Sequence, residues 1–418
     1  MMFYKETAFQ DTLIGKIPKD WEVTKMGNVA HVKGRIGWRG LKASEYTTEG
    51  PYLIANKHLV DDRIAWDKCD HLSEFRYNES PEIQLQTDDV IISKDGTIGQ
   101  PAFIDSLPDR ATINSTMMLL RVNNDVLAPE FLFYFLQGLH FRRFLKQKIS
   151  GTSIPHLFQR DMKELDVLLP SVLEQRGVVG VLGVVDLAVA KTGEVIAKTE
   201  RLKKGLMQEL LTKGIGHKEW NVVQLEDLIS DVKNGFASGK RDEKGIVQVR
   251  MNNITTDGRL VLDSYLKVPT PENIDVWLLR PNDFLFNNTN SIDLVGKSAI
   301  FKGASFPCTF SNHFTRIRFK ENLVLPEWIL YHFITHWQKG YFKSVAIRHV
   351  GQAAVHTEYL LRLKISLPPL DEQKKIVEIL STTNRKLELE RNEKTKLEKI
   401  KRVLMDLLLT GKVRVKGD

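Results

Sequence analysis

Two long stretches of the chain, residues 174–212 and 372–410, carry apolar residues at a helical spacing. Within each stretch the apolar positions recur mostly every three, four or seven residues, which is the pattern of a heptad stripe along one face of a helix. A helix of about 39 residues would be roughly 58 Å long, which is too long for the core of one domain. We therefore predict that both helices protrude and pair with each other as an antiparallel coiled coil. The predicted seam residues are Val178, Leu182, Val185, Val189, Ile376, Leu380, Leu387, Leu397 and Leu404.

The segments that precede these two helices show a different pattern. Short runs rich in β-branched and aromatic residues, such as Val90–Ile92 and Thr315–Phe319, stand between turn signals such as the Asp-Gly pair at 257–258. Pro129 and Pro326 then open amphipathic helical stretches, because proline is tolerated in the first turn of a helix. The sequence therefore predicts an α+β fold class: two mixed α/β domains in tandem repeat, each followed by a long helix.

The chain also repeats itself. Residues 168–178 read LLPSVLEQRGV and residues 366–376 read SLPPLDEQKKI, and aligning their Glu-Gln pairs gives an offset of 198 positions that holds without a gap along both helical stretches. The similarity extends more loosely into the preceding segments, as in the pairs Trp21/Trp220 and Asp89/Asp283. A period of this length indicates two domain-sized halves and not a solenoid. The predicted domains are residues 1–165 and 216–362, and the predicted helical segments are residues 166–215 and 363–418.

One difference separates the two copies of the helix. The first copy contains Gly177, Gly180, Gly183, Gly193 and Gly205, whereas the second has no glycine between Glu372 and Thr410. Each glycine inside a helix costs about 1 kcal/mol relative to alanine. Close approach of another backbone, simple divergence, or a helix broken near Gly193 would each account for the difference.

Composition and charge limit the classes of function. The chain has 418 residues, 60 Lys and Arg against 52 Asp and Glu, and a net charge of +8. This length exceeds what one hydrophobic core usually serves, and the positive charge makes a polyanion such as nucleic acid a reasonable partner without proving one. Cys69 and Cys308 stand far apart and outside any zinc-ligand spacing. With no recognisable signal peptide or membrane span, we predict a cytoplasmic protein.

Motifs that would carry catalysis are not found. Residues 291–298, SIDLVGKS, resemble a phosphate-binding loop, but Ser291 takes the place of the first glycine, and the related stretch at Gly99 lacks the lysine. We interpret this stretch as a turn between strands. The signatures of amino-methyltransferases that act on DNA bases, of metal-dependent nucleases and of metal-binding histidines are not recognisable. Catalysis by this chain alone is therefore not predicted.

The loops instead supply polar and basic residues suited to reading DNA. Arginine or lysine can bond guanine and asparagine or glutamine can bond adenine in the major groove, although each such residue taken singly is more often an ordinary solvated loop residue. The candidates in the first domain are Lys33, Arg35, Arg39, Asn56, Lys57, Lys94, Thr97 and Asn114. Those in the second domain are Lys240, Arg241, Arg250, Asn252, Asn253, Asn288, Asn290, Arg348 and Gln352.

Two copies of Leu-Pro-x-x-x-Glu-Gln leading into a long helix, each preceded by a domain that begins near Trp21 or Trp220, resemble the specificity subunit of type I restriction-modification systems. The stretch from Asp89 to Gly99 also resembles a strand-and-turn element of that family's target recognition domains. The resemblance covers essentially the whole chain.

This resemblance implies a DNA-binding subunit without catalytic activity of its own. Two target recognition domains would each read one half of a split duplex site, while the paired helices set the gap between the halves and dock the modification subunits. Those methyltransferase subunits would bring S-adenosylmethionine and methylate adenine. A restriction subunit would supply ATP-driven translocation and cleavage. S-adenosylmethionine, ATP and magnesium are accordingly expected in the partner subunits, and no cofactor or metal in this chain.

The chain departs from the family pattern in two places. The first Glu-Gln copy is unusually rich in glycine, which puts in doubt whether both helices dock a modification subunit equally. The second domain has Asn290–Gly296 in place of the Asp-Gly-Thr-Ile-Gly turn, so the roles of loop residues do not transfer between the domains. The alternatives are a self-contained DNA-modifying enzyme and a coiled-coil adaptor that joins proteins and ignores DNA.

Overall fold

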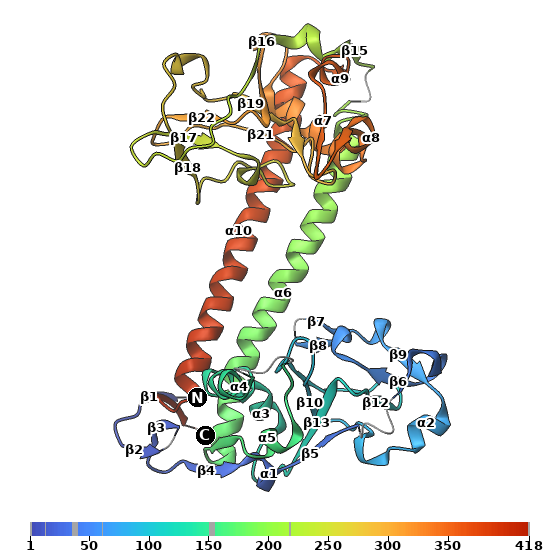
Figure 1. Ribbon diagram of the computed structural model, residues 1–418, viewed down its shortest axis with the longest axis vertical. Helices are drawn as coiled ribbons and strands as arrows, with labels where there is room; N and C mark the ends of the chain where they lie inside the picture. Colours follow the sequence, from blue (N-terminus) through green and yellow to red (C-terminus); the bar gives the residue numbers. More distant parts are fainter. Residues whose placement is uncertain are drawn as a thin grey trace. The chain divides into compact units, whose positions relative to one another are not determined.

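The computed structural model describes residues 2–12, 14–35, 41–60, 62–149, 155–216 and 219–416. It divides into two compact units, unit 1 with residues Met1–Gly193 and Asn392–Asp418, and unit 2 with residues Glu194–Arg391. Two helices of 39 residues each, α6 (Val172–Leu210) and α10 (Leu370–Leu408), contribute a segment to both units (Figure 1). The predicted helix length is therefore confirmed, and both helices begin two residues before the predicted position.

Unit 1 is a mixed α/β domain. Its strands are β1 (Met2–Lys5), β2 (Phe9–Thr12), β3 (Gly15–Pro18), β4 (Glu22–Lys25), β5 (Ala30–Gly34), β6 (Tyr46–Ile54), β7 (Leu59–Val60), β8 (Arg63–Ile64), β9 (Asp70–Leu72), β10 (Val90–Ser93), β11 (Pro101–Phe103), β12 (Ala111–Ile113), β13 (Met117–Val122), β14 (Asp166–Leu169) and β27 (Val413–Lys416). Its shorter helices are α1 (Met26–Val29), α2 (Glu74–Asn78), α3 (Pro129–Phe135), α4 (Leu139–Ile149) and α5 (Gln159–Lys163). The largest sheet has the order β11-β10-β13-β5, and a second sheet has the order β12-β6-β9.

Unit 2 repeats this plan. Its strands are β15 (Asn221–Gln224), β16 (Ile229–Asn234), β17 (Ile246–Val249), β18 (Leu266–Val268), β19 (Phe284–Asn287), β20 (Thr289–Asn290), β21 (Ser298–Ile300), β22 (Cys308–Phe310), β23 (Phe314–Phe319), β24 (Ile347–His349), β25 (Gln352–Ala354) and β26 (Lys364–Leu367). Its shorter helices are α7 (Pro326–Gln338), α8 (Tyr341–Val345) and α9 (Thr357–Leu361). The sheet orders β21-β19-β23-β16 and β22-β17-β18 match those of unit 1 strand for strand, and β22 runs parallel to β17 as β12 does to β6. The predicted duplication and the α+β class are confirmed.

The central strand of each large sheet is buried on both faces. In unit 1, Val90 and Ile92 pack against helix α3, whereas Ile91 packs into a second core with the three-stranded sheet. Phe284 and Leu285 divide between two cores in the same way in unit 2. Because successive side chains of a strand point to opposite faces, a strand between two layers reads as a continuous apolar run.

The glutamine of the Glu-Gln motif joins each long helix to its domain. Gln175 is fully buried, donates from Nε2 to the carbonyls of Val126 and Pro170 (both 2.9 Å), and accepts the N–H of Ala128 (2.7 Å). Gln373 makes the three corresponding bonds, to Leu323 (3.0 Å), Pro368 (2.9 Å) and Leu325 (2.9 Å). A buried backbone group left without a partner is costly, so the repeated glutamine has a structural reason.

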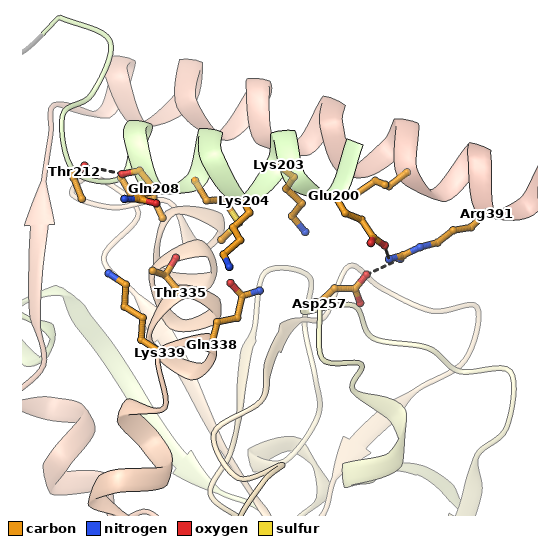
Figure 2. A pocket seen from close by; sticks show the side chains of 13 residues that line it. Glu200, Lys203, Lys204, Gln208, Thr212, Asp257, Thr335, Gln338, Lys339 and Arg391 are labelled. Carbon is orange, nitrogen blue, oxygen red and sulfur yellow. Dashed lines mark hydrogen bonds and ion pairs between the residues drawn. The ribbon is translucent and has the colours of Figure 1, made fainter. Parts of the chain in front are cut away.

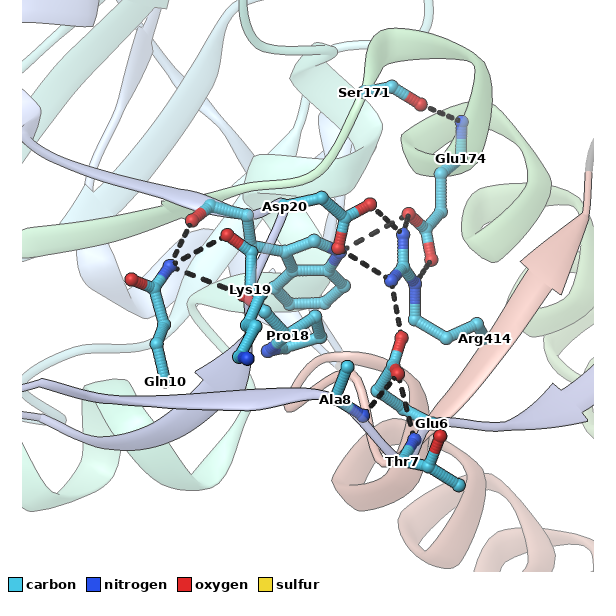
Figure 3. Close-up of polar contacts among 11 residues, drawn as sticks. Glu6, Thr7, Ala8, Gln10, Pro18, Lys19, Asp20, Ser171, Glu174 and Arg414 are labelled. Carbon is cyan, nitrogen blue, oxygen red and sulfur yellow. Dashed lines mark hydrogen bonds and ion pairs between the residues drawn. The ribbon is translucent and has the colours of Figure 1, made fainter.

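The glutamate of the same motif anchors an ion cluster in unit 1 (Figure 3). Arg414 of β27 bonds Glu174 through Nε (2.6 Å) and Nη2 (2.7 Å), and also reaches Asp20 (2.7 Å) and Glu6 (2.7 Å). Burial opposes the charge of Arg414, but the hydrogen bonds to these three carboxylates outweigh burial and raise its pKa. Strand β27 also pairs with β1, so β1 and β27 are both held at the beginning of α6.

The predicted seam residues fall into two groups. Val178 and Leu182 are buried in the core of unit 1, and Ile376 and Leu380 are buried in the core of unit 2, so these four hold the helices to their domains. Leu387 is also buried. The remaining members are half-buried: Val185, Val189, Leu397 and Leu404.

The two long helices run antiparallel within each unit. In unit 1, Lys401 of α10 forms an ion pair with Asp186 of α6 (2.7 Å), and Lys394 lies beside Gly193. In unit 2, Arg391 of α10 pairs with Glu200 of α6 (2.7 Å). Continuous heptad packing along the full length of the helices stays a prediction.

The glycines of α6 have no common explanation. The helix continues through Gly193, so the alternative of a break there is wrong. A side chain at Gly177 would stand 3.0 Å from Val415, which fits close packing at that position. Within the described residues, nothing lies within 4 Å of the corresponding point at Gly205. Close approach therefore accounts for Gly177 and not for Gly205.

Candidate nucleic-acid interface

Three polar candidates of unit 1 meet at Thr116. Asn56 opens a short 3-10 helix (Asn56–His58), and its N–H bonds Thr116 Oγ1 (3.1 Å). Asn114 accepts a bond from Thr116 Oγ1 (2.7 Å), and Lys94, directly after β10, donates its N–H to the carbonyl of Thr116 (2.9 Å). Asn56 also donates from Nδ2 to the carbonyl of Asp95 (2.9 Å). The structure thus brings Asn56, Lys94 and Asn114 into one polar cluster.

Lys94 gives this cluster its charge. Burial lowers the pKa of Lys94 because a partly desolvated ammonium group is penalised, and the nearby Asp95 offsets only part of the penalty. A hydrogen-bond acceptor on DNA would stabilise the charged ammonium group of Lys94 and offset the cost of its burial. Asp95 also bonds His156, a residue that the sequence patterns did not single out for this cluster.

The other candidates of unit 1 lie in different surroundings. Lys57 is exposed and pairs with Asp70 (2.8 Å), Thr97 is exposed, and Lys33 is half-buried in β5. Arg35 is only 3% exposed and donates to the carbonyl of Ile113 (3.1 Å) and to Ser80 (3.3 Å). Because its guanidinium is already bonded inside the domain, we leave Arg35 out of the proposed contact surface. Arg39 lies outside the described residues.

In unit 2, three candidates lie on the small sheet β20-β25-β24, and a fourth, Asn288, directly precedes β20. Asn290 of β20 pairs with Ala353 of β25, and Arg348 of β24 pairs with the same residue on the other side. Arg348 and Gln352 are exposed. Asn288 is half-buried and donates to Thr315 Oγ1 (3.0 Å), while the buried Asn290 donates to Asn287 Oδ1 (2.6 Å). Arg348 and Gln352 are thus the outward-facing members of this group.

The remaining candidates of unit 2 lie around the end of β17. Lys240, Arg241 and Asn252 are exposed, and Arg250 is half-buried with Nη2 bonded to the carbonyl of Ser238 (3.2 Å). Asn253 is 3% exposed and donates to the carbonyls of Val261 (3.0 Å) and Ser264 (2.8 Å). Its amide therefore holds the loop together, and we leave Asn253 out of the proposed contact surface.

A hairpin tip between β24 and β25 was missed by the sequence patterns. Val350 is fully exposed at this tip, beside the exposed His349, and Gly351 follows with φ of 77°. The sequence signal for this hairpin is a glycine between two short runs, Ile347–His349 and Gln352–Ala354. From these runs, only Arg348 and Gln352 are among the predicted DNA contacts. An exposed apolar side chain flanked by cationic and polar ones is suited to contact in a DNA groove.

The lysine of the stretch that resembles a phosphate-binding loop has a structural role. Lys297 of this stretch is 7% exposed and donates from Nζ to the carbonyls of Met251 and Ile254. The stretch forms a turn between β20 and β21, so the turn interpretation is confirmed.

Burial raises the pKa of Cys69 to about 12 and that of Cys308 to about 11, so both thiols are protonated at neutral pH. Among the described residues, no group of histidine, cysteine or acidic side chains could hold a metal ion. None of the described helices is long and apolar enough to cross a membrane.

Comparisons with known proteins agree on one family. The model of the type I restriction modification DNA specificity domain matches residues 18–200 and 217–399. The chain is 28% identical over 438 aligned positions to the type I restriction enzyme MjaVIII specificity subunit of Methanocaldococcus jannaschii, covering 100% of this chain and 98% of that protein. It is 21% identical to the StySPI specificity subunit of Salmonella potsdam, covering 87% of this chain and 82% of that protein.

Solved structures show the same fold at low sequence identity. The crystal structure of the type I restriction-modification S subunit from M. genitalium aligns with a TM-score of 0.59 at 15% identity, covering 93% of this chain and 96% of that one. A chain from a structural study of complex assembly and conformational transition of the type I R-M system aligns with a TM-score of 0.57 at 18% identity, covering 95% and 99%. With two matches to the family model that together span most of its length, the chain belongs to the type I restriction-modification DNA specificity family and is a specificity subunit with two tandem recognition domains.

Proposed function

We propose that this subunit reads a split duplex target, with one half-site for each unit's domain. The observation that carries the proposal is that equivalent backbone positions of the two domains hold different side chains. Lys94 directly follows β10 and Asn288 directly follows the equivalent strand β19. Likewise Lys57 and Asn252 are the exposed middle residues of equivalent short helices, Asn56–His58 and Met251–Asn253.

These pairs differ in the bases that they suit. A lysine favours the acceptors of guanine, whereas an asparagine can bond both the donor and the acceptor of adenine. Two copies of one scaffold would therefore approach the two half-sites similarly while preferring different bases. The basic side chains would also bind phosphates and so contribute affinity without sequence preference.

The long helices are the proposed docking surface for the modification subunits and the spacer between half-sites. They expose apolar side chains, including Val184 (69%) and Leu187 (54%) in unit 1 and Leu202 (57%) and Leu389 (66%) in unit 2. Exposed apolar groups of this size on a helix favour a protein partner. The methyltransferase partners would supply S-adenosylmethionine, and a restriction partner would supply ATP hydrolysis with magnesium. The chain itself acts without a cofactor and without a catalytic site.

The test is base-resolution mapping of adenine methylation in cells that contain the modification subunit, with and without this chain. We expect a split motif with a fixed gap that appears only when the chain is present. Replacing residues 20–160 by the corresponding domain of another specificity subunit should then change one half of the motif and preserve the other.

Three results would contradict the proposal. A change in both halves of the motif after the replacement would exclude one half-site for each domain. Methylation or cleavage of DNA by the purified chain without partners would instead show a self-contained enzyme. A chain that assembles with its partners yet binds no duplex DNA at low salt would be an adaptor.

A further inference from the structure

Unit 2 contains a cavity of about 460 Å³ that none of the functions above uses (Figure 2). Helix α6 forms one wall with Lys203, Lys204 and Met207, and helix α7 contributes Thr335 and Gln338. Its apolar lining includes the buried side chains of Met207, Leu211 and Leu387. This volume lies within the range of pockets that bind small molecules.

The carboxylates at this cavity are already occupied. Arg391 of α10 pairs with Glu200 (2.7 Å) and with Asp257 (2.9 Å). Asp257 also accepts hydrogen bonds from Arg259 (3.1 Å) and from Thr255 (2.5 Å). Both carboxylates are thus paired with arginine, and among the described residues neither forms an ion pair with the lysines on the same wall.

Among the residues that the structure describes, none forms an ion pair with the side chains of Lys203, Lys204 or Lys339. Figure 2 shows Lys204 extending from α6 toward Gln338 and Lys203 extending into the space between Gln338 and Asp257. Within the described part of the chain, Lys203 makes no hydrogen bond or ion pair, and its side chain is half-buried. Burial lowers the pKa of Lys203, with the nearby Arg391 and Arg259 adding to the effect and Asp257 opposing it.

The equivalent site of unit 1 shows what Lys203 is missing. The repeat offset of 198 relates Lys203 to Lys401 and Asn384 to Asp186. In unit 1, Lys401 pairs with Asp186 (2.7 Å), which also accepts the hydroxyl of Tyr134 (2.8 Å). In unit 2, Asn384 donates to the corresponding hydroxyl of Tyr331 (3.2 Å). At the position that supplies the counter-ion in unit 1, unit 2 therefore has an uncharged amide.

From this geometry we infer that the cavity of unit 2 binds a small phosphomonoester with an apolar or aromatic body of about nucleotide size. Four cations, Lys203, Lys204, Lys339 and Arg391, line the cavity against two carboxylates, Glu200 and Asp257, and this leaves two positive charges to be balanced. A phosphomonoester carries close to two negative charges at neutral pH. Lysine ammonium groups bind phosphate as point charges, while the apolar floor accepts the body of the ligand.

Such a ligand would connect α6 to α7. Lys203 and Lys204 belong to α6, whereas Gln338 is the last residue of α7, so a ligand whose phosphate is bound by the two α6 lysines would also contact α7. Binding would therefore stabilise unit 2 by mass action, independently of DNA. The inference concerns a site separate from the proposed DNA contacts and does not depend on them.

Isothermal titration of the full-length chain with 1-naphthyl phosphate, adenosine 5′-monophosphate and inorganic phosphate tests the inference. 1-Naphthol and adenosine serve as controls that keep the body and lack the phosphate. We expect binding of a phosphate compound, accompanied by a rise in the unfolding temperature of unit 2, and no binding of either control. Asn384→Asp should weaken the binding by roughly tenfold or more, because it restores the counter-ion that neutralises Lys203.

Matched variants separate loss of the site from loss of the fold. Asn384→Asp copies the arrangement of unit 1 and should fold normally, and Lys203→Ala should weaken binding to a similar degree. Lys375→Ala removes an exposed lysine of α10 outside the cavity and should leave binding unchanged. The inference is overturned if neither 1-naphthyl phosphate nor adenosine 5′-monophosphate binds, even if inorganic phosphate does. It is also overturned if the controls bind equally well, or if Lys203→Ala and Lys375→Ala have the same effect.

Discussion

The two units share one topology but complete it differently at the beginning of their long helices. In unit 2, Glu372 accepts the indole N–H of Trp220 (3.3 Å) and the backbone N–H of Ile215 (3.0 Å), which belongs to the segment leading directly to Trp220. In unit 1, Glu174 accepts the indole N–H of Trp21 (3.2 Å) and the guanidinium of Arg414, which comes from the other end of the chain. The equivalent glutamates thus differ in one partner, which is a backbone N–H for Glu372 in unit 2 and a charged side chain for Glu174 in unit 1.

This difference shows that two copies of one domain can reach the same arrangement through two different connections. In unit 2 the segment after α6 leads on to Trp220, whereas in unit 1 the segment after α10 lies beside Trp21 without being continuous with it in the chain. Strand β27 takes that place, and Gly411 (φ 67°) packs on Trp21 as Gly214 (φ 69°) packs on Trp220. In unit 2, where the segment is continuous with Trp220, one backbone hydrogen bond to Glu372 is enough. In unit 1, where β27 is not continuous with Trp21, several ionic hydrogen bonds of Arg414 hold the strand in place.

The largest effect is therefore expected from breaking the ionic connection of unit 1. Arg414→Ala leaves Glu174, which is 5% exposed, without a cation, and removing one partner of a buried ion pair costs about 3–5 kcal/mol. Glu372→Gln in unit 2 keeps an uncharged acceptor and should cost less than about 1 kcal/mol. Urea unfolding and hydrogen exchange of β1 and β27 measure both variants. Equal effects of the two variants would contradict the distinction between the two units.

The two units should respond alike to loss of the buried glutamine at the beginning of each long helix. Gln175→Leu and Gln373→Leu each leave three backbone groups without their partner, so each should cost about 2–3 kcal/mol in the unfolding free energy of its own unit. Gln86→Leu, at an exposed position, is the control and should have little effect. Urea unfolding of the three variants decides the matter. A large effect in only one unit would show that the motif has a structural role in one copy alone.

Sequence patterns predicted what depends on local periodicity and on the repeat. The spacing of apolar residues in the two aligned repeats predicted the length of α6 and α10. The paired prolines predicted the start of α3 at Pro129 and of α7 at Pro326. The repeated Glu-Gln pair is visible in the sequence, but the bonds of its glutamine are not, because two of the three backbone partners of Gln175, at Val126 and Ala128, lie in a segment remote from it in sequence.

Candidate contact residues were harder to predict because exposure depends on the packed fold. Arg35 and Asn253 have the composition expected of DNA-reading residues, yet both are buried and bonded to backbone carbonyls. Conversely, Val350 is apolar and was not selected, although it is fully exposed at a hairpin tip. The asymmetry between Asp186 and Asn384 was present in the repeat, but its consequence for Lys203 required the register of the two helices.

A smaller effect is expected when the reading positions of the two domains are exchanged. Lys57→Asn should alter base preference in one half of the methylated motif, and Asn252→Lys should alter it in the other half, each by about 1–3 kcal/mol of discrimination. Both residues are exposed, so the domains should remain folded. Methylation mapping with the modification subunit measures the preference. If either variant changed both halves, or neither variant changed any base, these positions would not read DNA.

The smallest effect concerns an ion pair that only unit 2 has. Arg391 of unit 2 corresponds through the repeat offset to Gly193 of unit 1, which cannot make such a pair. Burial opposes ionisation of Asp257, but hydrogen bonds from Thr255 and Arg391 and the charge of Arg259 outweigh it and lower its pKa from 3.8 to about 2. The folded state therefore binds the proton of Asp257 less readily than the unfolded state does.

It follows that Asp257 stabilises unit 2 fully above about pH 4 and loses this contribution as the pH falls toward about 2. Asp257→Asn should remove this part of the acid dependence, whereas Asp275→Asn, at an exposed position, should retain it. Unfolding midpoints of the two variants between pH 5 and pH 2.5 compare them, with unit 1 serving as the internal reference because it lacks the pair. Since the pair is partly exposed and screened by salt, the difference should also shrink as the salt concentration rises. Parallel pH profiles for the two variants would mean that the charge of Asp257 contributes nothing to the stability of unit 2.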